Sequence, residues 1–589
     1  MKTYIHSFWS GILLTLMFLF SFHVAQAQVE VGKTYRIVSL AAPTMSLITQ
    51  NSSLESNVNI VLWAETDVAS QQWTLSGTLP ETATFRNAYS RLTLGLSKTS
   101  EGGTARQGGT GGRWTLEAVN ESENIYKFQQ KSNGLYLTAI ADEQGKYIDG
   151  AVPQMAAATD DLTQHWQLVE VEPKATFTAA MREEMMDAYI KKAVESVGTN
   201  RKTFGKGGWG EAEQLEVVLD AYETTGRADY LTLARNIYNY FNANVGTSWN
   251  KLVYTDSYHW FGHDFNDDVM WQIMAVARLG LLTGGGKNNS YIRAAKNNFD
   301  IIYNRAYIPE VGLMRWAENS GDPWGTNSCI AGPTEVAACY LGFAGCGEEY
   351  FDKARELYQA QRYALAGNMT TGKVWDSVVW NPETMKVKSK NEWASTYNQG
   401  TMLGAACMLY KYYGETQYLS DARKIMSWTK SNLCDSKGII NVCQGGDNHD
   451  LYGFKGILMR YVRRFARDCK QDTYKEWLLK NALHAYCNRS TEGVTSTAWL
   501  QKGTAENTSD DFGCSTAASA AVNVILDDDP ALPYEESPQY DAISQPRLVF
   551  LNNGTTQYFD LSGRCLMKPV GRGTFIVHRN GKTTKIIVK

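Results

Sequence analysis

The spacing of apolar residues divides the chain into three parts. In residues 28–172, apolar and polar residues alternate in short runs between turns rich in Gly, Asn, Ser and Asp, a pattern that predicts β-strands. In residues 173–529, apolar residues recur at the i, i+3, i+4 spacing of helices, with hardly any strand pattern. Residues 530–589 begin as an acidic, Pro-containing linker and then become strand-like. We therefore expect a multidomain protein: a β domain, a helical domain and a small carboxy-terminal β segment.

The helical part predicts two alternating sets of six helices. One set begins near Glu211, Phe265, Pro333, Thr396, Leu451 and Cys514, and the other occupies residues 180–197, 229–244, 289–305, 348–367, 417–433 and 473–489. The first set is apolar on most of its circumference, as in 400–407, whereas the second is amphipathic and charged, as in 418–425. Helices that are apolar nearly all round lie inside a fold. Six inner helices alternating with six outer ones predict an all-α (α/α)6 toroid.

The first turns of the predicted inner helices are rich in polar and aromatic side chains. They read Gly208-Trp209-Gly210, Asn266-Asp267-Asp268, Asn327-Ser328, Thr396-Tyr397-Asn398-Gln399, Asp447-Asn448-His449-Asp450 and Asp510-Asp511. In a toroid these starts open on one face, with the positive ends of the helix dipoles pointing into it. The sequence therefore predicts a ligand cleft at that face.

Two adjacent carboxylates, Asp267 and Asp268, stand at one of these helix starts. Their carboxyl groups can lie roughly 5 to 6 Å apart, close to the separation of about 5 to 5.5 Å in retaining glycosidases. The alternative is that Asn266 and the two acids only cap the helix and complement its dipole. Aromatic residues lead into the pair, and Trp271 follows one turn later. This aromatic setting suits sugar rings and favours the catalytic interpretation.

Composition narrows the range of ligands. The net charge is -4 and the pI is about 6.1, without a basic run that could follow phosphates, so we expect no nucleic-acid partner. The 17 Trp and 32 Tyr agree with saccharide recognition. Neither a C-x-x-C nor an H-E-x-x-H motif occurs, and the eight histidines are scattered. We therefore expect no cofactor and no essential metal.

The amino terminus resembles a targeting segment. Lys2 precedes an apolar run at 12–20, and Ala25-Gln26-Ala27 follows, which predicts a signal peptide cleaved near Ala27. No later apolar run has the roughly 20 residues that a membrane span requires. We expect a soluble, exported monomer, located at the cell surface, outside the cell or in the periplasm.

The cysteines have a separate prediction. All ten lie between Cys329 and Cys565, and an exported protein can form disulfides. Cys339, Cys407 and Cys469, however, lie in helical patterns where a small buried apolar residue is expected. Which other cysteines pair stays open.

A weak triplication marks residues 28–172. Gln71-Gln72-Trp73, Gly112-Arg113-Trp114 and Gln164-His165-Trp166 each end a unit. They resemble the Gln-x-Trp repeats of ricin-type β-trefoil lectins, with a departure at Gly112. The resemblance implies that the three Trp pack the core and that the module binds sugar, but no loop pattern identifies a lectin site.

The carboxy-terminal segment resembles the sorting domains of type IX secretion. The similarity lies in Asp560-Leu561-Ser562-Gly563-Arg564 and in two strands joined by Asn580-Gly581, a strong hairpin signal. The alternative is a small β-domain with no sorting role.

Three segments in the helical part together resemble glycoside hydrolase family 76, the endo-α-1,6-mannanases. These are residues 265–271, 396–400 and 454–461. The resemblance implies an (α/α)6 fold, hydrolysis of α-1,6-mannan with retention, Asp267 as nucleophile and Asp268 as general acid/base. Trp271-Gln272 departs from the family's usual doubled Trp, which concerns the subsites rather than the acids.

Other candidate residues follow from their positions. The substrate-binding candidates at the helix starts or leading into the acids are Trp209, Trp260, Asn266, Tyr397, Asn398 and Gln399. Asp510-Asp511 is a rival acidic pair that we expect to be an N-cap, and Lys455 and Arg460 are expected to form structural ion pairs below the cleft.

Two further functions compete with an endo-α-1,6-mannanase. One is another toroid glycosidase, such as an unsaturated glucuronyl hydrolase, which would need basic residues in the cleft, and the predicted helix starts lack Arg. The other is a non-catalytic mannan-binding surface protein, which would not need both acids.

Overall fold

The structure is a computed structural model that describes residues 29–194, 209–244, 253–254, 260–261, 264–446, 448–530, 557–559, 565–566, 573–579 and 582–588. Two compact units make up the chain, Met1–Ala175 and Thr176–Lys589. The predicted signal peptide and the Asn580-Gly581 turn lie outside the described residues. No described helix is both long and apolar enough to cross a membrane.

The first unit is built from short antiparallel strands. They are β1 (Thr34–Ser39), β2 (Ala42–Thr49), β3 (Ile60–Ala64), β4 (Trp73–Ser76), β5 (Thr84–Asn87), β6 (Leu94–Leu96), β7 (Ala105–Gln107), β8 (Trp114–Asn120), β9 (Ile125–Gln130), β10 (Tyr136–Thr138), β11 (Gln154–Ala156) and β12 (Trp166–Glu170). Ten strands share one sheet, in which β11, β10, β9, β12, β1, β2 and β3 are successive neighbours, while β6 and β7 pair separately. Alternation directs residues such as Tyr35 and Ile37 into one hydrophobic core.

The three tryptophans of the sequence triplication occupy equivalent positions in this core. Trp73, Trp114 and Trp166 are fully buried, and each indole donates to a main-chain carbonyl at 3.0, 3.1 and 3.0 Å, respectively. The Phe128 ring lies 6.1 Å from Trp114 and 6.5 Å from Trp166. The predicted packing role of the three Trp is confirmed, and the trefoil assignment stays a prediction.

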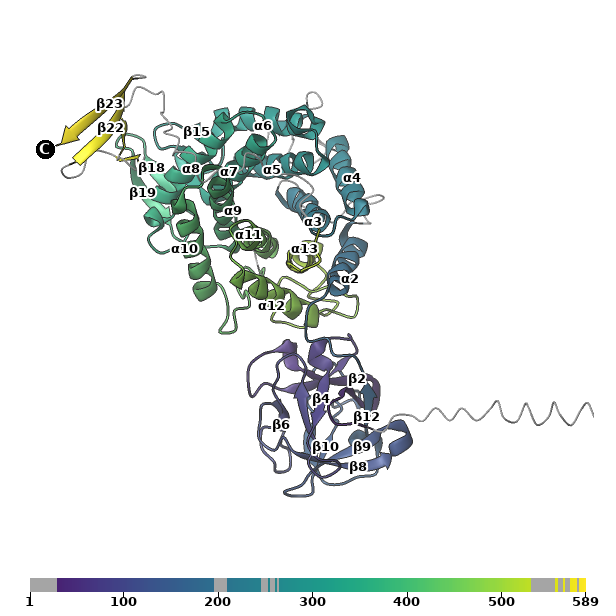
Figure 1. The fold of residues 1–589 in the computed structure, drawn as a ribbon. Helices are drawn as coiled ribbons and strands as arrows, with labels where there is room; N and C mark the ends of the chain where they lie inside the picture. Colours follow the sequence, from purple (N-terminus) through teal and green to yellow (C-terminus); the bar gives the residue numbers. More distant parts are fainter. Residues whose placement is uncertain are drawn as a thin grey trace, which may run out of the picture. The chain divides into compact units, whose positions relative to one another are not determined.

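The second unit contains the two predicted sets of helices. The inner helices are α3 (Trp209–Thr225), α5 (Asn266–Thr283), α7 (Ser328–Phe343), α9 (Thr396–Tyr413), α11 (Phe454–Asp468) and α13 (Asp511–Val522); the outer ones are α2 (Ala179–Tyr189), α4 (Ala228–Asn244), α6 (Ser290–Ala306), α8 (Glu349–Ala364), α10 (Thr416–Asn432) and α12 (Thr473–Cys487). Each inner helix contacts the next, and α13 contacts α3, so the ring closes as Figure 1 shows. Each outer helix packs against the inner ring, and α4, α6, α8 and α12 each contact two neighbouring inner helices. The twelve helices form an (α/α)6 toroid.

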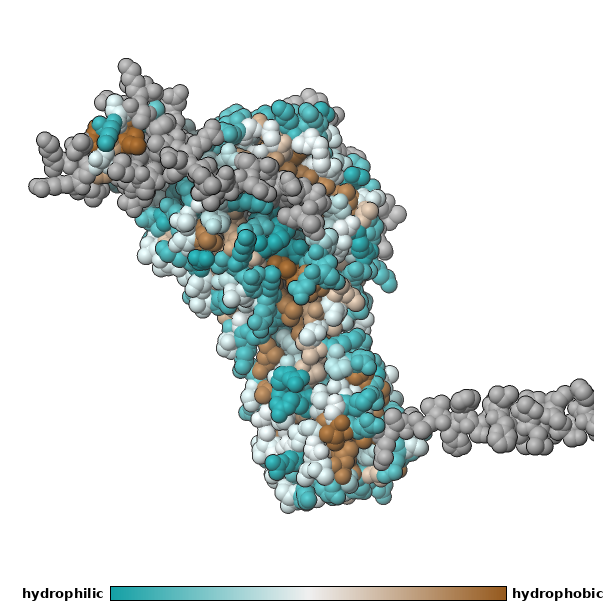
Figure 2. Space-filling view, in the orientation of Figure 1, coloured by the Kyte–Doolittle hydropathy of each residue, from teal (hydrophilic) through white to brown (hydrophobic). Residues whose placement is uncertain are grey.

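Small residues allow the inner helices to approach closely. A Cβ atom on Gly404 would overlap the ring of Tyr461, and one on Gly400 would lie 3.0 Å from the Cα atom of Leu458. Both contacts join α9 to α11. On the face shown in Figure 2, the described surface of the toroid is mostly hydrophilic or neutral, as expected when the apolar residues of the inner helices are enclosed.

One helix begins earlier than its apolar pattern predicted, at the polar Asn327-Ser328 start that the sequence also indicated. Helix α7 starts at Ser328 rather than near Pro333, which lies inside the helix. Proline lacks the N–H that would bond to the carbonyl of Cys329. A proline is therefore more typical of a helix start than of a helix interior. The earlier start brings Asn327, at the N-cap, and Cys329 to the same face as the other inner-helix starts.

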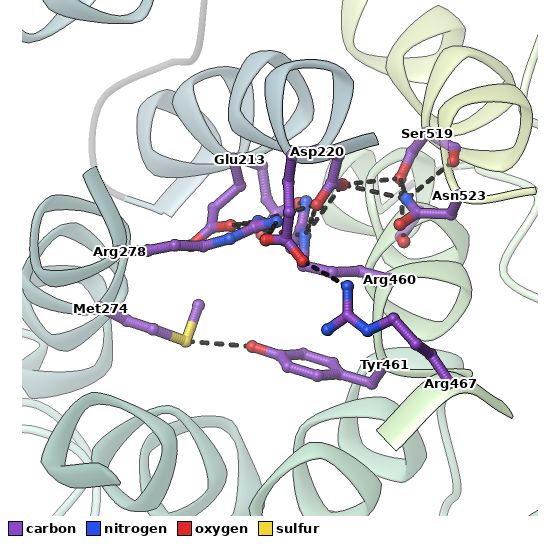
Figure 3. A network of polar contacts seen from close by, with 12 residues as sticks. Glu213, Asp220, Met274, Arg278, Arg460, Tyr461, Arg467, Ser519 and Asn523 are labelled. Atoms are coloured by element: carbon purple, nitrogen blue, oxygen red, sulfur yellow. Dashed lines mark hydrogen bonds and ion pairs between the residues drawn. The ribbon is translucent and has the colours of Figure 1, made fainter. Parts of the chain in front are cut away.

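A buried charge network joins the inner helices (Figure 3). The guanidinium of Arg460 donates to both oxygens of Glu213, at 2.9 and 3.0 Å, and to Asp220 at 3.0 Å. Arg278 donates to Asp220 at 2.7 Å and to Glu223 at 2.8 Å. The predicted structural role of Arg460 is confirmed.

The prediction for Lys455 was wrong. Its ammonium donates to the carbonyls of Ile440 (3.1 Å) and Thr497 (2.7 Å) and lies 4.8 Å from the centroid of the Trp499 ring. These neutral partners replace the expected ion pair, and burial lowers the pKa of Lys455 to about 7. Cys339, Cys407 and Cys469 are buried, as expected.

Short strands complete the second unit. They are β13 (Val253–Tyr254), β14 (Trp260–Phe261), β15 (Tyr307–Ile308), β16 (Leu313–Met314), β17 (Gly325–Asn327), β18 (Ser377–Asn381), β19 (Lys386–Asn391), β20 (Gln557–Phe559), β21 (Cys565–Leu566), β22 (Gly573–Arg579) and β23 (Lys582–Val588). The last four form a sheet in which β22 and β23 pair as predicted, while its sorting role stays a prediction. The sheet β17-β18-β19 was not predicted, and it contributes to the site.

Candidate active site

A pocket of about 350 Å³ opens at the starts of the inner helices. Its volume is within the range typical of small-molecule sites. The residues that line it are Trp209, Asp267, Trp271, Trp316, Asn327, Cys329, Asp376, Tyr397, Asp450 and Phe454. They include the first turns of α3, α5, α9 and α11 and the N-cap of α7, so the predicted convergence of these helix starts is confirmed.

The two adjacent acids occupy the first turn of α5. The N-cap is Phe265, which offers no side-chain cap, and Asp267 and Asp268 follow Asn266 in the first turn. One oxygen of Asp268 accepts a hydrogen bond from the main-chain N–H of Trp209 at 3.1 Å. Asp267 faces the pocket and has a buried oxygen, Oδ1, without a hydrogen-bond partner among the described residues. Helix capping alone does not explain a buried carboxylate oxygen that has no hydrogen-bond partner among the described residues.

The pKa of Asp267 is higher than its position at a helix start would suggest. Burial, and then the negative charge of Asp268, raise the pKa of Asp267 to about 7, although the thiol of Cys329 and the side chain of Trp316 favour its charged form through hydrogen bonds. The amides and the dipole of a helix start would by themselves favour the ionised form of Asp267. Desolvation outweighs that effect in the unliganded pocket, and the pair titrates as one unit.

Trp316 reaches the pocket from the segment between α6 and α7. The N–H of Asn266 donates to the carbonyl of Trp316 at 2.8 Å, and the N–H of Glu318 donates to the carbonyl of Asp264 at 3.0 Å. A carboxylate oxygen of Asp264 also accepts from the N–H of Asn319 at 2.6 Å. These bonds fasten Trp316 beside the acids, and no sequence pattern indicated them.

Two further carboxylates border the pocket. Asp376 directly precedes β18, and its Oδ2 accepts hydrogen bonds from Ser377 and Asn391, both at 3.1 Å. Burial raises the pKa of Asp376. Asp450 lies in the 3-10 helix η9 (His449–Tyr452) and accepts from the indole N–H of Trp209 at 3.3 Å. Neither was a predicted site residue, although Asp450 stood at a predicted helix start.

The five predicted substrate-binding residues whose side chains are described separate into two groups. Trp209 and Tyr397 line the pocket as expected. Trp260 lies in β14, and its side chain is outside the described residues.

Asn266 does not line the pocket. Its buried side chain donates to the carbonyl of Arg315 (3.1 Å) and to Glu318 (2.8 Å), and it accepts from Arg305 at 2.9 Å. It therefore holds the segment that carries Trp316.

Gln399 also has a structural position. It is fully buried, accepts from the N–H of Val374 at 2.6 Å, and donates to the carbonyl of Gly372 and the hydroxyl of Thr429, both at 3.0 Å. These bonds join α9 to α10 and to the segment that leads into β18. Asn398 is equally buried and is not part of the pocket lining. Polar side chains at an inner-helix start can point away from the open face. The sequence could not distinguish these side chains from those that point into the pocket.

The rival acidic pair has the predicted capping role. Asp510 is the N-cap of α13 and accepts from the N–H of Gly513 at 2.8 Å. Its other oxygen lies 2.7 Å from Nε2 of His449. Asp511 belongs to the first turn of α13, and its side chain is outside the described residues.

The pocket is acidic and aromatic. Neither Lys nor Arg is among the described residues that line it, and the described residues contain no group of His, Cys, Asp and Glu side chains arranged to hold a metal. The ring of Phe454 lies 4.1 Å from that of Tyr397 and 5.5 Å from that of Trp209. Paired carboxylates can supply a nucleophile and a proton donor, while aromatic walls pack against sugar rings. Together, the toroid and this site define a glycosidase.

The family-model comparison identifies the family. Residues 174–537 match the model of glycosyl hydrolase family 76, and the chain belongs to this family. The helical unit is therefore a glycoside hydrolase domain. No curated protein matches the chain.

Several solved structures are similar. The α-1,6-mannanase GH76A from Salegentibacter sp. HEL1_6 is 25% identical, with 58% of this chain and 98% of that chain covered and a TM-score of 0.49. An inactive variant of that mannanase with two Asp-to-Ala substitutions, in complex with α-1,6-mannotetrose, is 24% identical over 59% and 99% of the chains, with a TM-score of 0.49. A family 76 glycoside hydrolase from a bovine Bacteroides thetaiotaomicron strain is 16% identical over 68% and 95%, with a TM-score of 0.50, and shares the fold.

Proposed function

We propose that the protein is a retaining endo-α-1,6-mannanase that hydrolyses the α-1,6-linked backbone of mannan through a covalent glycosyl-enzyme. The observation that carries this proposal is the Asp267–Asp268 pair in an aromatic pocket of a family 76 domain. The neutral substrate fits the described lining of the pocket, in which no basic side chain takes part.

The first chemical step requires Asp267 ionised and Asp268 protonated. A carboxylate oxygen of Asp267 attacks the anomeric carbon, while Asp268 transfers its proton to the departing glycosidic oxygen. Because burial and the charge of Asp268 raise the pKa of Asp267 to about 7, the two acids share a proton near and below that pH. The hydrogen bonds from Cys329 and Trp316 favour the charged form of Asp267 and so help to place that proton on Asp268.

In the second step Asp268 acts as a base. It accepts a proton from water as the water oxygen attacks the anomeric carbon, and the bond to Asp267 breaks. The product keeps the configuration of the substrate, and both carboxyl groups return to their starting states. The N–H of Trp209, 3.1 Å from Asp268, stabilises the latter's carboxylate form between the two steps.

The competing functions lack comparable support. An unsaturated glucuronyl hydrolase would need cationic side chains near its uronate, and the described lining of the pocket has carboxylates instead. A non-catalytic mannan-binding protein would not need two acids at one helix start.

We further propose that residues 28–172 form a ricin-type trefoil that holds the enzyme on its polymer, and that residues 1–27 direct export.

The test is product analysis on linear α-1,6-mannan. Wild-type protein is expected to release short manno-oligosaccharides, and Asp267→Ala and Asp268→Ala each to lose about 10³-fold or more of the rate. Asp527→Ala, which removes an exposed carboxylate, serves as the matched control. NMR of the first products formed should show the α-anomer. No products from the wild type, or β-anomers, would contradict the proposal.

A further inference from the structure

Trp393 is a large aromatic side chain that stands partly in solvent next to the pocket. It is 45% exposed and lies between β19 and α9. The centroid of its ring is 6.5 Å from that of Phe454, which lines the pocket, and the two planes form an angle of 49°. A single exposed apolar side chain is common, but one that is continuous with other apolar groups at a pocket marks a binding surface.

The ring of Trp393 extends an aromatic series that begins at the acids. The ring of Trp271, one turn after Asp268, has its centroid 6.3 Å from that of Tyr397. The centroid of Tyr397 is in turn 4.1 Å from that of Phe454. Trp393 follows Phe454 in this series but does not line the pocket itself. The aromatic surface therefore continues from the catalytic pair past the edge of the pocket.

The backbone around Trp393 is held on both sides. Its N–H donates to the side-chain oxygen of Asn391 at 3.1 Å, and the amide of Asn391 donates to Asp376 at 3.1 Å. Two residues later, Ser395 caps α9 by accepting from the N–H of Asn398 at 3.2 Å. A fixed backbone lowers the entropy that Trp393 would lose on binding, and Asn391 links it to a carboxylate of the pocket.

We propose that Trp393 is the platform of a sugar subsite outside the catalytic pocket, where it stacks against the apolar face of a pyranose ring in the substrate chain. This inference rests on the proposed function and extends it, because it explains cleavage of inner bonds. A chain that occupies both the pocket and the platform must continue beyond the sugars at the cleaved bond. Short substrates that fill only the pocket do not reach Trp393.

The kinetic test compares chain lengths. Trp393→Ala is expected to lower kcat/KM about 10-fold on long α-1,6-manno-oligosaccharides and less than about 2-fold on the shortest cleaved one. Trp393→Phe should restore most of the loss. Tyr363→Ala, which removes an aromatic side chain that is 69% exposed on the outer helix α8, is the matched control and should change neither value. An equal loss at every length, or no loss at any, overturns the proposal.

A binding experiment separates this proposal from the proposed function. The Asp267→Asn/Asp268→Asn protein, with and without Trp393→Ala, is run through gels that contain α-1,6-mannan or one of several other neutral polysaccharides. Retardation by mannan that Trp393→Ala weakens supports both ideas. Retardation only by another glycan, again weakened by Trp393→Ala, keeps the platform and overturns mannan as substrate. Retardation that Trp393→Ala leaves unchanged, together with no chain-length-dependent loss of kcat/KM, overturns the platform, as does the absence of retardation in every gel.

Discussion

At the scale of single residues, the protonation of Asp267 links catalysis to stability. Its pKa rises from an ordinary value of 3.8 to about 7 in the folded protein, because the carboxyl group is buried beside Asp268. Folding therefore favours the protonated form. The stabilisation from this proton is complete below about pH 4 and is lost as the pH rises through 7.

Asp267→Asn should consequently stabilise the protein more at pH 8 than at pH 5. The amide imitates the neutral acid and removes a buried charge that costs on the order of 4 kcal/mol at alkaline pH, more than half of which arises between pH 5 and pH 8. Thermal unfolding at the two pH values measures the difference, with Asp527→Asn as an exposed control. A gain of equal size at pH 5 and pH 8 would show that burial of charge is not its cause.

The separate roles of the two acids give a second prediction. An aryl α-1,6-mannobioside with a dinitrophenolate leaving group needs no proton for departure. Asp268→Ala should therefore release dinitrophenolate in a rapid burst and then turn over slowly, because water is no longer activated. Asp267→Ala should show no burst, since no glycosyl-enzyme can form. Stopped-flow absorbance measures both. A burst in Asp267→Ala alone would exchange the assigned roles.

The sequence predicted those site residues whose chemistry depends on a helix start. Asp267 and Tyr397 are examples, since apolar periodicity located α5 and α9 and the pocket forms where they begin. Trp316 could not be found this way, because hydrogen bonds to the segment before α5 position it and no pattern encodes them. Gln399 stands at the same helix start as Tyr397 but is buried among main-chain partners. Tyr397 and Gln399 lie at different angles around the helix axis, so only the side chain of Tyr397 reaches the pocket.

At the scale of secondary-structure elements, strong periodicity predicted the twelve helices, but not the hairpin that carries Asp376. Every residue of β19 is exposed, and its sequence, Lys-Val-Lys-Ser-Lys-Asn, offers no buried alternation. A strand that buries nothing leaves little trace in an apolar pattern. Asp376 and Trp393 both depend on this hairpin, so both were missed.

The charge network between inner helices predicts a large effect of Arg460. Arg460→Met would leave Glu213 without its bidentate partner and Asp220 with one fewer donor in a buried region. We expect a loss of about 3 kcal/mol in the free energy of unfolding, because the remaining charges cannot be rehydrated. Denaturant titration measures it.

The control removes an ion pair at the surface. Lys475 lies 2.9 Å from Asp472, and both side chains are exposed. Lys475→Met should change stability by less than about 0.5 kcal/mol. If Arg460→Met were equally mild, the network would contribute little to the stability of the toroid.

At the scale of the whole molecule, the two units have separate cores. The core of the first unit is formed entirely by residues of that unit, from Val29 to Leu168. The toroid closes through contacts of its own helices. Each unit therefore buries enough apolar surface to unfold as its own cooperative transition.

Phe128→Ala tests this independence in the intact chain. The ring is fully buried, 5.0 Å from Phe85 and within 6.5 Å of Trp166, so its removal should cost about 3 kcal/mol. Calorimetry should show one transition lowered by roughly 10 °C and the other unchanged. Activity on soluble manno-oligosaccharides should stay within about 2-fold of wild type.

Leu403→Ala makes the opposite change, since Leu403 is fully buried in α9 of the toroid. It should lower the other transition and reduce activity, because α9 positions Tyr397 in the pocket. If either substitution shifted both transitions together, the units would stabilise one another. The first unit would then support the catalytic domain directly. In that case, a substitution in the first unit that reduces activity only on polymer would no longer show that this unit binds sugar.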